Sequence, residues 1–145
     1  LAYDKYRTHY TDEFAQEAAM EDIFQQAEII SFHVPLTPET RFLVDKLYLS
    51  NFSKNIFLLN TARGKIITLA TLVDALASGK IRGAALDVLE NEKLAQLSLE
   101  QQAAFHQLRQ SDRVLFTPHV AGWTFESYEK INRTLVEKIK ALELD

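Results

Sequence analysis

The chain has 145 residues, of which 47% are hydrophobic and 25% are charged, so its length and composition are those of one folded domain. It has no cysteine, which excludes a disulfide framework and a cysteine-based zinc site, and we expect no bound metal. Its formal net charge of −4 argues against a nucleic-acid partner, and no apolar run reaches the roughly 18 residues of a membrane span. We therefore expect a cytoplasmic protein with no nucleic-acid or membrane partner.

Short apolar segments alternate with amphipathic stretches along the chain, a pattern typical of a parallel sheet with helices on both faces. Residues 1–3 read as the end of a strand whose beginning is missing. Further strands are expected at 29–34, 56–60, 84–88 and 114–116, and helices at 20–27, 45–52, 69–78, 101–108 and 124–142. The predicted fold is an α/β doubly wound parallel sheet, Rossmann-like and incomplete at its N-terminal edge.

Local signals mark the ends of several of these elements. Pro35 cannot donate to a sheet and should end the 29–34 strand. The 56–60 strand is continuously apolar, which indicates burial on both faces. Thr68 and Gly79 are placed to cap the 69–78 helix. The last helix carries an apolar face formed by Tyr128, Ile131, Leu135 and Ile139.

Polar residues follow nearly every predicted strand. Ligands of doubly wound sheets bind beyond the carboxyl ends of the strands, so these residues mark the edge at which we expect function. They are Asp4 and the segments 33–37, 60–64, 87–92 and 117–122. The chain has four glycines, no two of them two residues apart, so it contains no G-x-G-x-x-G or Walker A loop.

Four segments in this order resemble the D-isomer-specific 2-hydroxyacid dehydrogenase family. They are His33-Val34-Pro35-Leu36-Thr37, Asn60-Thr61-Ala62-Arg63-Gly64, residues 83–92 and Thr117-Pro118-His119-Val120-Ala121-Gly122. Arg63 and Glu92 are 29 residues apart, and Glu92 and His119 are 27 apart. The resemblance covers essentially the whole chain. It implies an NAD-dependent oxidoreductase that transfers a hydride between nicotinamide and a D-2-hydroxy acid or 2-keto acid.

Three features depart from the family pattern. The glycine-rich phosphate loop that precedes the strand ending at Asp4 is absent, Lys93 stands where the family has proline, and the flanking substrate domain is missing. We therefore interpret residues 1–145 as a partial NAD-binding domain, with the substrate domain absent from this chain. For this chain alone we expect very weak NADH binding and no turnover, because the pyrophosphate lacks its usual backbone contacts.

The resemblance assigns catalytic roles to three residues whose chemistry suits them. The planar guanidinium of Arg63 would bind the substrate carboxylate. The imidazole of His119 would take the hydroxyl proton as hydride leaves, and return it during reduction. Glu92 would bind the other ring nitrogen, which fixes the tautomer and favours the imidazolium. Glu90 is a second candidate for this partner, but only Glu92 has the family spacing.

The resemblance also assigns residues to the cofactor. Asp4 would accept the adenine-ribose hydroxyls and repel a 2′-phosphate, which favours NAD, although Lys5 and Arg7 leave NADP open. Asp87 would reach the nicotinamide carboxamide. His33 is also an expected cofactor contact, although a structural role at the end of the strand is the favoured interpretation. The remaining expected cofactor contacts are Val34, Pro35, Thr40, Thr61, Ala62, Arg63, His119 and Gly122.

Two further expectations concern partners. Family members usually dimerise through the cofactor domain, so we expect a homodimer, and Trp123 lies either in the substrate pocket or in a subunit contact. The alternative to an enzyme is an NAD(H)-sensing interaction module, because some family members are transcriptional corepressors. Arg63, Glu92 and His119 favour the enzyme.

Overall fold

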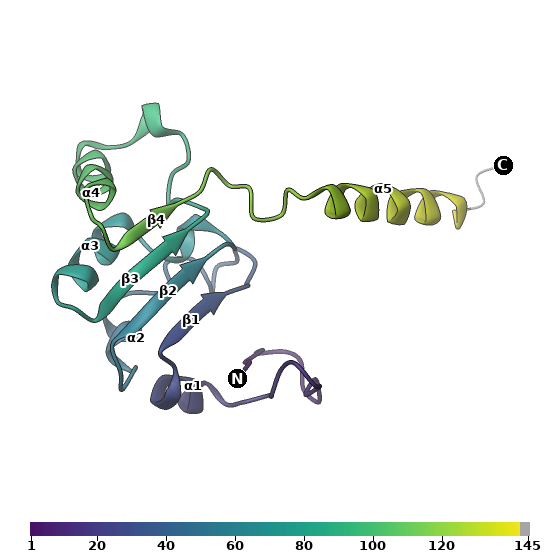
Figure 1. Cartoon of the computed structure of the whole chain (residues 1–145), viewed down its shortest axis with the longest axis horizontal. Coiled ribbons are helices and arrows are strands. Elements are labelled where there is room, and N and C mark those ends of the chain that lie inside the picture. Colours follow the sequence, from purple (N-terminus) through teal and green to yellow (C-terminus); the bar gives the residue numbers. More distant parts are fainter. Residues whose placement is uncertain (143–145) are drawn as a thin grey trace.

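The computed structural model describes residues 1–142 and contains one parallel sheet of four strands in the order β1-β2-β3-β4 (Figure 1). The strands are β1 (Ile29–Phe32), β2 (Ile56–Asn60), β3 (Ile81–Leu86) and β4 (Val114–Phe116). The helices are α1 (Met20–Gln26), α2 (Lys46–Ser50), α3 (Leu69–Ala77), α4 (Leu99–Arg109) and α5 (Phe125–Lys140), with 3-10 turns at Gly64–Ile66 and Leu94–Gln96. The predicted α/β, Rossmann-like class is confirmed.

The strands end level with one another. In the register Phe32 lies beside Asn60, Asn60 beside Leu86, and Leu86 beside Phe116. The backbone hydrogen bonding continues past the ends of the strands: the N–H of Asp87, directly after β3, donates to the carbonyl of Asn60 at 3.0 Å. The segments that follow the four strands therefore start from the same edge of the sheet.

The hydrophobic core lies on one face of the sheet only. Along β2 the side chains of Ile56 and Leu58 are fully buried, whereas Phe57 between them is 38% exposed. Right-handed crossovers between consecutive neighbouring strands put their helices on the same side, and α3 contacts both α2 and α4 there. The expectation that 56–60 is buried on both faces is wrong, and no described helix covers the second face, where Ile29 and Leu115 are also exposed.

The helix ends follow the local signals in the sequence. The hydroxyl of Thr68 accepts a hydrogen bond from the N–H of Thr71 and caps α3, and Gly79 after its end has φ +76°. Thr124 caps α5 in the same way. Helix α5 extends away from the sheet (Figure 1), and its apolar face is exposed to solvent.

The predicted helices differ from the structure by one or two residues at their ends, and three predicted strands differ as well. Ala2 forms a single bridge with Glu17 and does not join the sheet, so residues 1–3 are not part of a strand. Strand β1 ends at Phe32 and not at Val34, so the chain leaves the sheet two residues before the predicted end. Strand β3 covers 81–86 instead of 84–88, since Ile81 pairs with Ile56 at its beginning.

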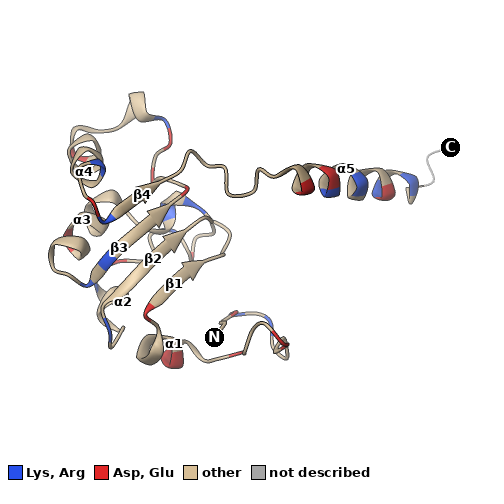
Figure 2. Ribbon diagram, in the orientation of Figure 1, with Lys and Arg blue, Asp and Glu red and all other residues tan. Residues whose placement is uncertain are grey.

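Charged residues occur in most parts of the ribbon, and α5 carries both acidic and basic residues (Figure 2). Glu129 and Arg133 form an ion pair at 2.7 Å one helical turn apart on this helix. Among residues 1–142, every helix is too short or too polar to cross a membrane.

Candidate active site

His119 and Glu92 meet at the carboxyl edge of the sheet, although 27 residues separate them. His119 lies in the turn after β4, and Glu92 lies in the loop between β3 and the 94–96 turn. The Nδ1 atom of His119 is 3.0 Å from Oε1 and 3.1 Å from Oε2 of Glu92. Within residues 1–142 no hydrogen bond engages Nε2, so this atom can face a substrate oxygen.

Asp87 joins the end of β3 to the turn that carries His119. The residue is only 4% exposed, and its carboxylate accepts hydrogen bonds from the Thr117 hydroxyl at 2.5 Å, the Val120 N–H at 2.8 Å and the Ala121 N–H at 2.9 Å. Burial acts to raise the pKa of Asp87, but these donors and the charge of His119 outweigh it, so the pKa lies below its ordinary value. Asp87 is therefore a buried, ionised anchor.

Arg63 lies in the turn after β2, and Asn60 shapes this turn. The fully buried Asn60 amide donates to the Arg63 carbonyl at 3.0 Å and accepts from the Ala62 N–H at 3.1 Å. The exposed guanidinium of Arg63 donates to the Ala62 carbonyl at 2.7 Å. It contacts neither Glu92 nor His119 through a hydrogen bond, so the three predicted catalytic residues are not joined in one network.

The turn that carries Arg63 touches the loop that carries Glu92. A Cβ atom built on Gly64 would lie 1.8 Å from the carbonyl oxygen of Leu89 and 2.7 Å from the backbone nitrogen of Glu90. Only glycine permits such an approach of two backbones. Arg63 and Glu92 are thus held on adjacent loops of the same edge.

Glu90 has a different partner from Glu92. Its Oε2 accepts the N–H of Leu69 at 2.9 Å, and its Oε1 accepts the Gln101 amide at 3.0 Å. The carboxylate therefore sits at the N-terminus of α3, where the helix dipole favours a negative charge. The geometry places Glu92, not Glu90, beside His119.

A cavity of about 260 Å³ lies at the ends of β2, β3 and β4. It is lined by Leu59, Thr61, Ala85, Leu86, Asp87, Leu115, Thr117, Val120 and Ala121. Its apolar floor belongs to the sheet face that no described helix covers, and the surface of the cavity is almost entirely apolar. A predominantly apolar surface is typical of small-molecule binding sites.

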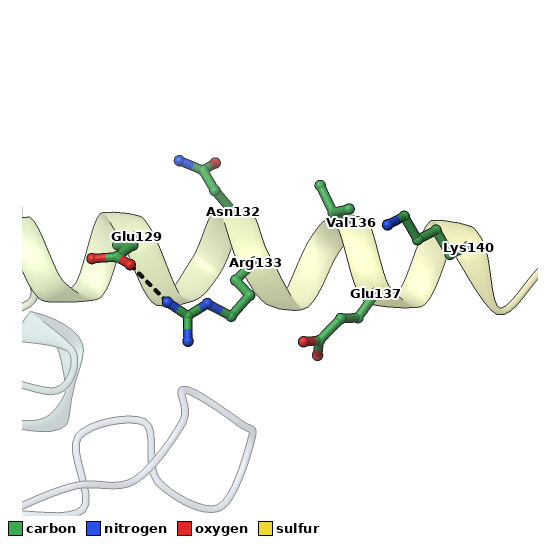
Figure 3. A pocket seen from close by; sticks show the side chains of 6 residues that line it. All are labelled: Glu129, Asn132, Arg133, Val136, Glu137 and Lys140. Carbon is green, nitrogen blue, oxygen red and sulfur yellow. Dashed lines mark hydrogen bonds and ion pairs between the residues drawn. The ribbon is translucent and has the colours of Figure 1, made fainter.

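A larger hollow, of about 470 Å³, lies along α5 and is not a candidate site (Figure 3). Its lining residues are Glu129, Asn132, Arg133, Val136, Glu137 and Lys140, all from one helix. A single exposed helix face cannot enclose a ligand, and no strand end contributes to this hollow. We therefore keep the smaller cavity as the candidate binding surface, although Arg63, Glu92 and His119 are not among the residues that line it.

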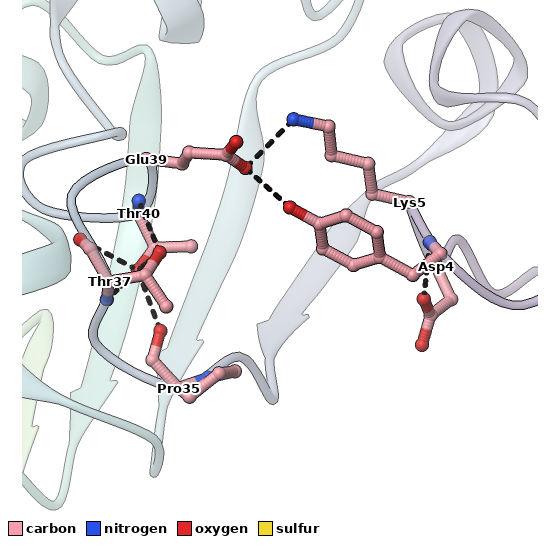
Figure 4. A network of polar contacts seen from close by, with 7 residues as sticks. Asp4, Lys5, Pro35, Thr37, Glu39 and Thr40 are labelled. Atoms are coloured by element: carbon pink, nitrogen blue, oxygen red, sulfur yellow. Dashed lines mark hydrogen bonds and ion pairs between the residues drawn. The ribbon is translucent and has the colours of Figure 1, made fainter.

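Asp4 lies in an N-terminal segment that Glu39 ties to the loop after β1 (Figure 4). The Oδ1 atom of Asp4 accepts the N–H groups of Tyr6 at 2.8 Å and Arg7 at 3.0 Å. Glu39 accepts from the Lys5 ammonium and the Tyr6 hydroxyl, each at 2.8 Å. These two donors hold the pKa of Glu39 below its ordinary value. Sequence reasoning missed Glu39, because its partners are more than 30 residues away.

The other predicted cofactor residues have varied surroundings. The Thr40 hydroxyl donates to the Pro35 carbonyl at 2.6 Å (Figure 4), which closes the loop after β1. His33 Nε2 lies 2.8 Å from the Ser31 hydroxyl, which supports the structural alternative for His33. Val34 packs against the core, Ala62 is buried, and Thr61 and Gly122 are exposed. Trp123 is 69% exposed.

Metal ligands do not gather at this edge. Nowhere in residues 1–142 do three or more histidine or acidic side chains form a group that could hold a metal ion.

The family model for the D-isomer specific 2-hydroxyacid dehydrogenase, NAD binding domain, matches residues 1–121. The chain belongs to this family. The expected resemblance is thereby confirmed, and so is the expected cofactor class, since the family domain is one that binds NAD.

Relatives agree in sequence and in fold. The D-specific alpha-keto acid dehydrogenase of Enterococcus faecalis is 36% identical over 143 residues, which are 95% of this chain and 42% of the relative. The hydroxypyruvate reductase of Thermotoga maritima is 32% identical over 139 residues, or 96% of this chain and 43% of the relative. The crystal structure of the Aquifex aeolicus D-lactate dehydrogenase with NAD and lactic acid matches with a TM-score of 0.79 and 29% identity, over 97% of this chain and 44% of that one. The chain thus spans less than half the length of these dehydrogenases.

Proposed function

We propose that this domain belongs to an NAD-dependent oxidoreductase that transfers a hydride between nicotinamide and a D-2-hydroxy acid or its 2-keto acid. The contact between His119 and Glu92 at 3.0 Å carries this proposal. An imidazole held through Nδ1 by a carboxylate has a fixed tautomer and presents Nε2 as base or acid. In this role His119 takes the proton from the substrate hydroxyl during oxidation and returns it during reduction.

Arg63 is the proposed substrate ligand. Its guanidinium is exposed, and its only hydrogen bond among the described residues goes to the carbonyl of the neighbouring Ala62. A 2-keto acid carboxylate can replace that single bond with a bidentate, charge-assisted pair. Because Gly64 holds this turn against the loop of Glu92, a substrate bound by Arg63 lies on the same edge as His119.

NAD fits the same edge in two places. The cavity beside Asp87 and Thr61 can take the nicotinamide ring, and the Oδ2 atom of Asp4 remains available for the adenine-ribose hydroxyls. NAD, when bound, supplies the hydride acceptor. The negative charge of Asp4 would repel a 2′-phosphate, which favours NAD over NADP.

Cofactor binding is tested with residues 1–145 alone. Trp123, the single tryptophan of the chain, lies four residues after His119, so its fluorescence should report a bound nicotinamide. We expect weak but saturable quenching by NADH, reduced in Asp4→Asn and smaller still with NADPH. We expect no turnover from these residues alone, because they contain no G-x-G-x-x-G loop. An absence of saturable quenching, with an intact fold, would contradict the proposed cofactor site.

Catalysis is tested in a chimera in which these residues replace the matching segment of the Enterococcus faecalis relative. The chimera should reduce 2-keto acids with NADH and oxidise D- but not L-2-hydroxy acids. His119→Gln should lower kcat about a thousandfold, as expected for loss of a general acid–base. The matched variant His106→Gln, on the exposed side of α4, should leave activity unchanged. Equal activity of both variants would refute the role of His119.

We further propose that the protein is a homodimer and lies in the cytoplasm. The uncovered sheet face exposes Ile29, Phe57 and Leu115, and α5 exposes a second apolar face, and exposed apolar patches often mark protein–protein contacts. Sedimentation of residues 1–145 should therefore show self-association that weakens in Leu135→Ser. NADH-dependent capture of a partner by a chimera that shows no turnover would favour the sensing module instead.

A further inference from the structure

Asp87 contacts the protein more extensively than a cofactor ligand needs to. Its Oδ1 accepts from the Thr117 hydroxyl and the Val120 N–H, and its Oδ2 accepts from the Ala121 N–H. A carboxylate has about four acceptor positions, so three are occupied by the protein and one remains for a ligand. All three donors belong to one turn, and that turn contains His119.

The backbone of this turn adopts a conformation that needs support. His119 has φ +57°, in the left-handed region that costs a non-glycine residue about 1–2 kcal/mol. The donors that bind Asp87 lie on both sides of it, with Thr117 before and Val120 and Ala121 after. The carboxylate therefore clamps the chain on either side of the strained residue.

Asp87 itself is held rigidly. Its N–H donates to the Asn60 carbonyl at 3.0 Å, and the N–H of Thr117 donates to the carbonyl of Leu86 at 3.0 Å. These bonds extend the sheet past the strand ends, so the clamp is anchored on the central strands. Glu92, in contrast, is half exposed on a loop and meets the imidazole only if the turn already presents Nδ1.

We propose that Asp87 is the positioning residue for His119: its carboxylate holds the 117–121 turn in the conformation that directs Nδ1 of the imidazole at Glu92. This inference rests on the proposed function, in which His119 transfers the proton. It adds a second duty to the expected contact with the nicotinamide carboxamide, which can use the remaining acceptor position on Oδ2.

The test uses residues 1–145 without cofactor or substrate and follows the amide hydrogen exchange of Val120 and Ala121 and the NMR signals of the His119 ring. In Asp87→Asn the side-chain NH₂ cannot accept the third hydrogen bond, so exchange at these amides should rise about tenfold and the ring signals should move. Thr117→Val removes one donor without changing the charge of Asp87 and should give a smaller rise, about threefold. Asp112→Asn, the same change at an exposed aspartate before β4, should leave both measurements unchanged.

Unchanged exchange and ring signals in Asp87→Asn would overturn the inference, because the carboxylate would then serve the cofactor alone. If Asp87→Asn does not fold, Thr117→Val decides, and wild-type exchange in that variant would overturn the inference equally. Failure of the proposed function has a different signature. Turnover by the chimera with His119→Gln would remove the catalytic role of His119 while leaving the clamp measured by exchange in place.

Discussion

Replacing Gly64 by alanine tests whether two backbones hold the edge of the site together. The added Cβ would lie 1.8 Å from the carbonyl oxygen of Leu89, and ordinary contact begins at 3.4 Å, so the two loops must separate by about 1.6 Å. The opposing atoms are backbone and cannot rotate away. We expect a cost at the upper end of the usual 1–3 kcal/mol for overpacking, about 3 kcal/mol.

The cost should appear as a fall in Tm of about 12 °C, since 1 kcal/mol corresponds to about 4 °C for a domain of this size. Thermal unfolding followed by circular dichroism measures it. Gly122→Ala is the matched control, because a Cβ there meets nothing within 4 Å and its φ is not positive, so its Tm should stay within about 2 °C of the wild type. If Gly64→Ala melts at the same temperature as the control, the loops of Arg63 and Glu92 are not in contact in solution and Gly64 does not hold them at one edge.

Three further predictions concern neighbouring groups. Because the pKa of Asp87 is lower in the folded protein, its ionised carboxylate stabilises the fold at pH values above its ordinary pKa of 3.8, and this stabilisation is lost as the pH falls through the native pKa. The Tm difference between wild type and Asp87→Asn should therefore shrink between about pH 5 and about pH 3. A Tm difference that stays constant over this range would refute the prediction. Glu90→Gln should lower the free energy of unfolding in urea by about 1 kcal/mol but leave the pH–rate profile of the chimera unchanged. Glu92→Gln should shift that pH–rate profile with little effect on the free energy of unfolding. The reverse outcome would exchange the roles of the two residues. Thr68→Ala should cost about 1 kcal/mol by loss of the α3 cap, and an unchanged urea midpoint would show that the cap contributes nothing.

Elements with strong local signals were predictable. Helix α3 follows from its apolar spacing between Thr68 and Gly79, and the four strands follow from short apolar runs that end in polar residues. Because parallel strands end at one edge of a sheet, the sequence alone could also place Arg63, Glu92 and His119 on the same edge.

Other features depended on contacts between distant residues. The family spacing favoured Glu92 over Glu90 as the partner of His119, but the role of Glu90 was not visible in the sequence. In the structure the Glu90 carboxylate reaches the N-terminus of α3, whereas that of Glu92 reaches the imidazole. The close approach at Gly64 and the ties of Glu39 involve partners far along the chain, so no local pattern reports them.

The sequence by itself determined the order of strands and helices, the residues at the strand ends and the family, because these depend on side-chain periodicity and short motifs. Only the tertiary structure decided which sheet face is covered and that Asp87 binds the turn of His119. The reason is physical: hydrophobic periodicity reports that a side chain can be buried, whereas the direction of a crossover and the partner of a carboxylate are fixed only when distant segments pack together.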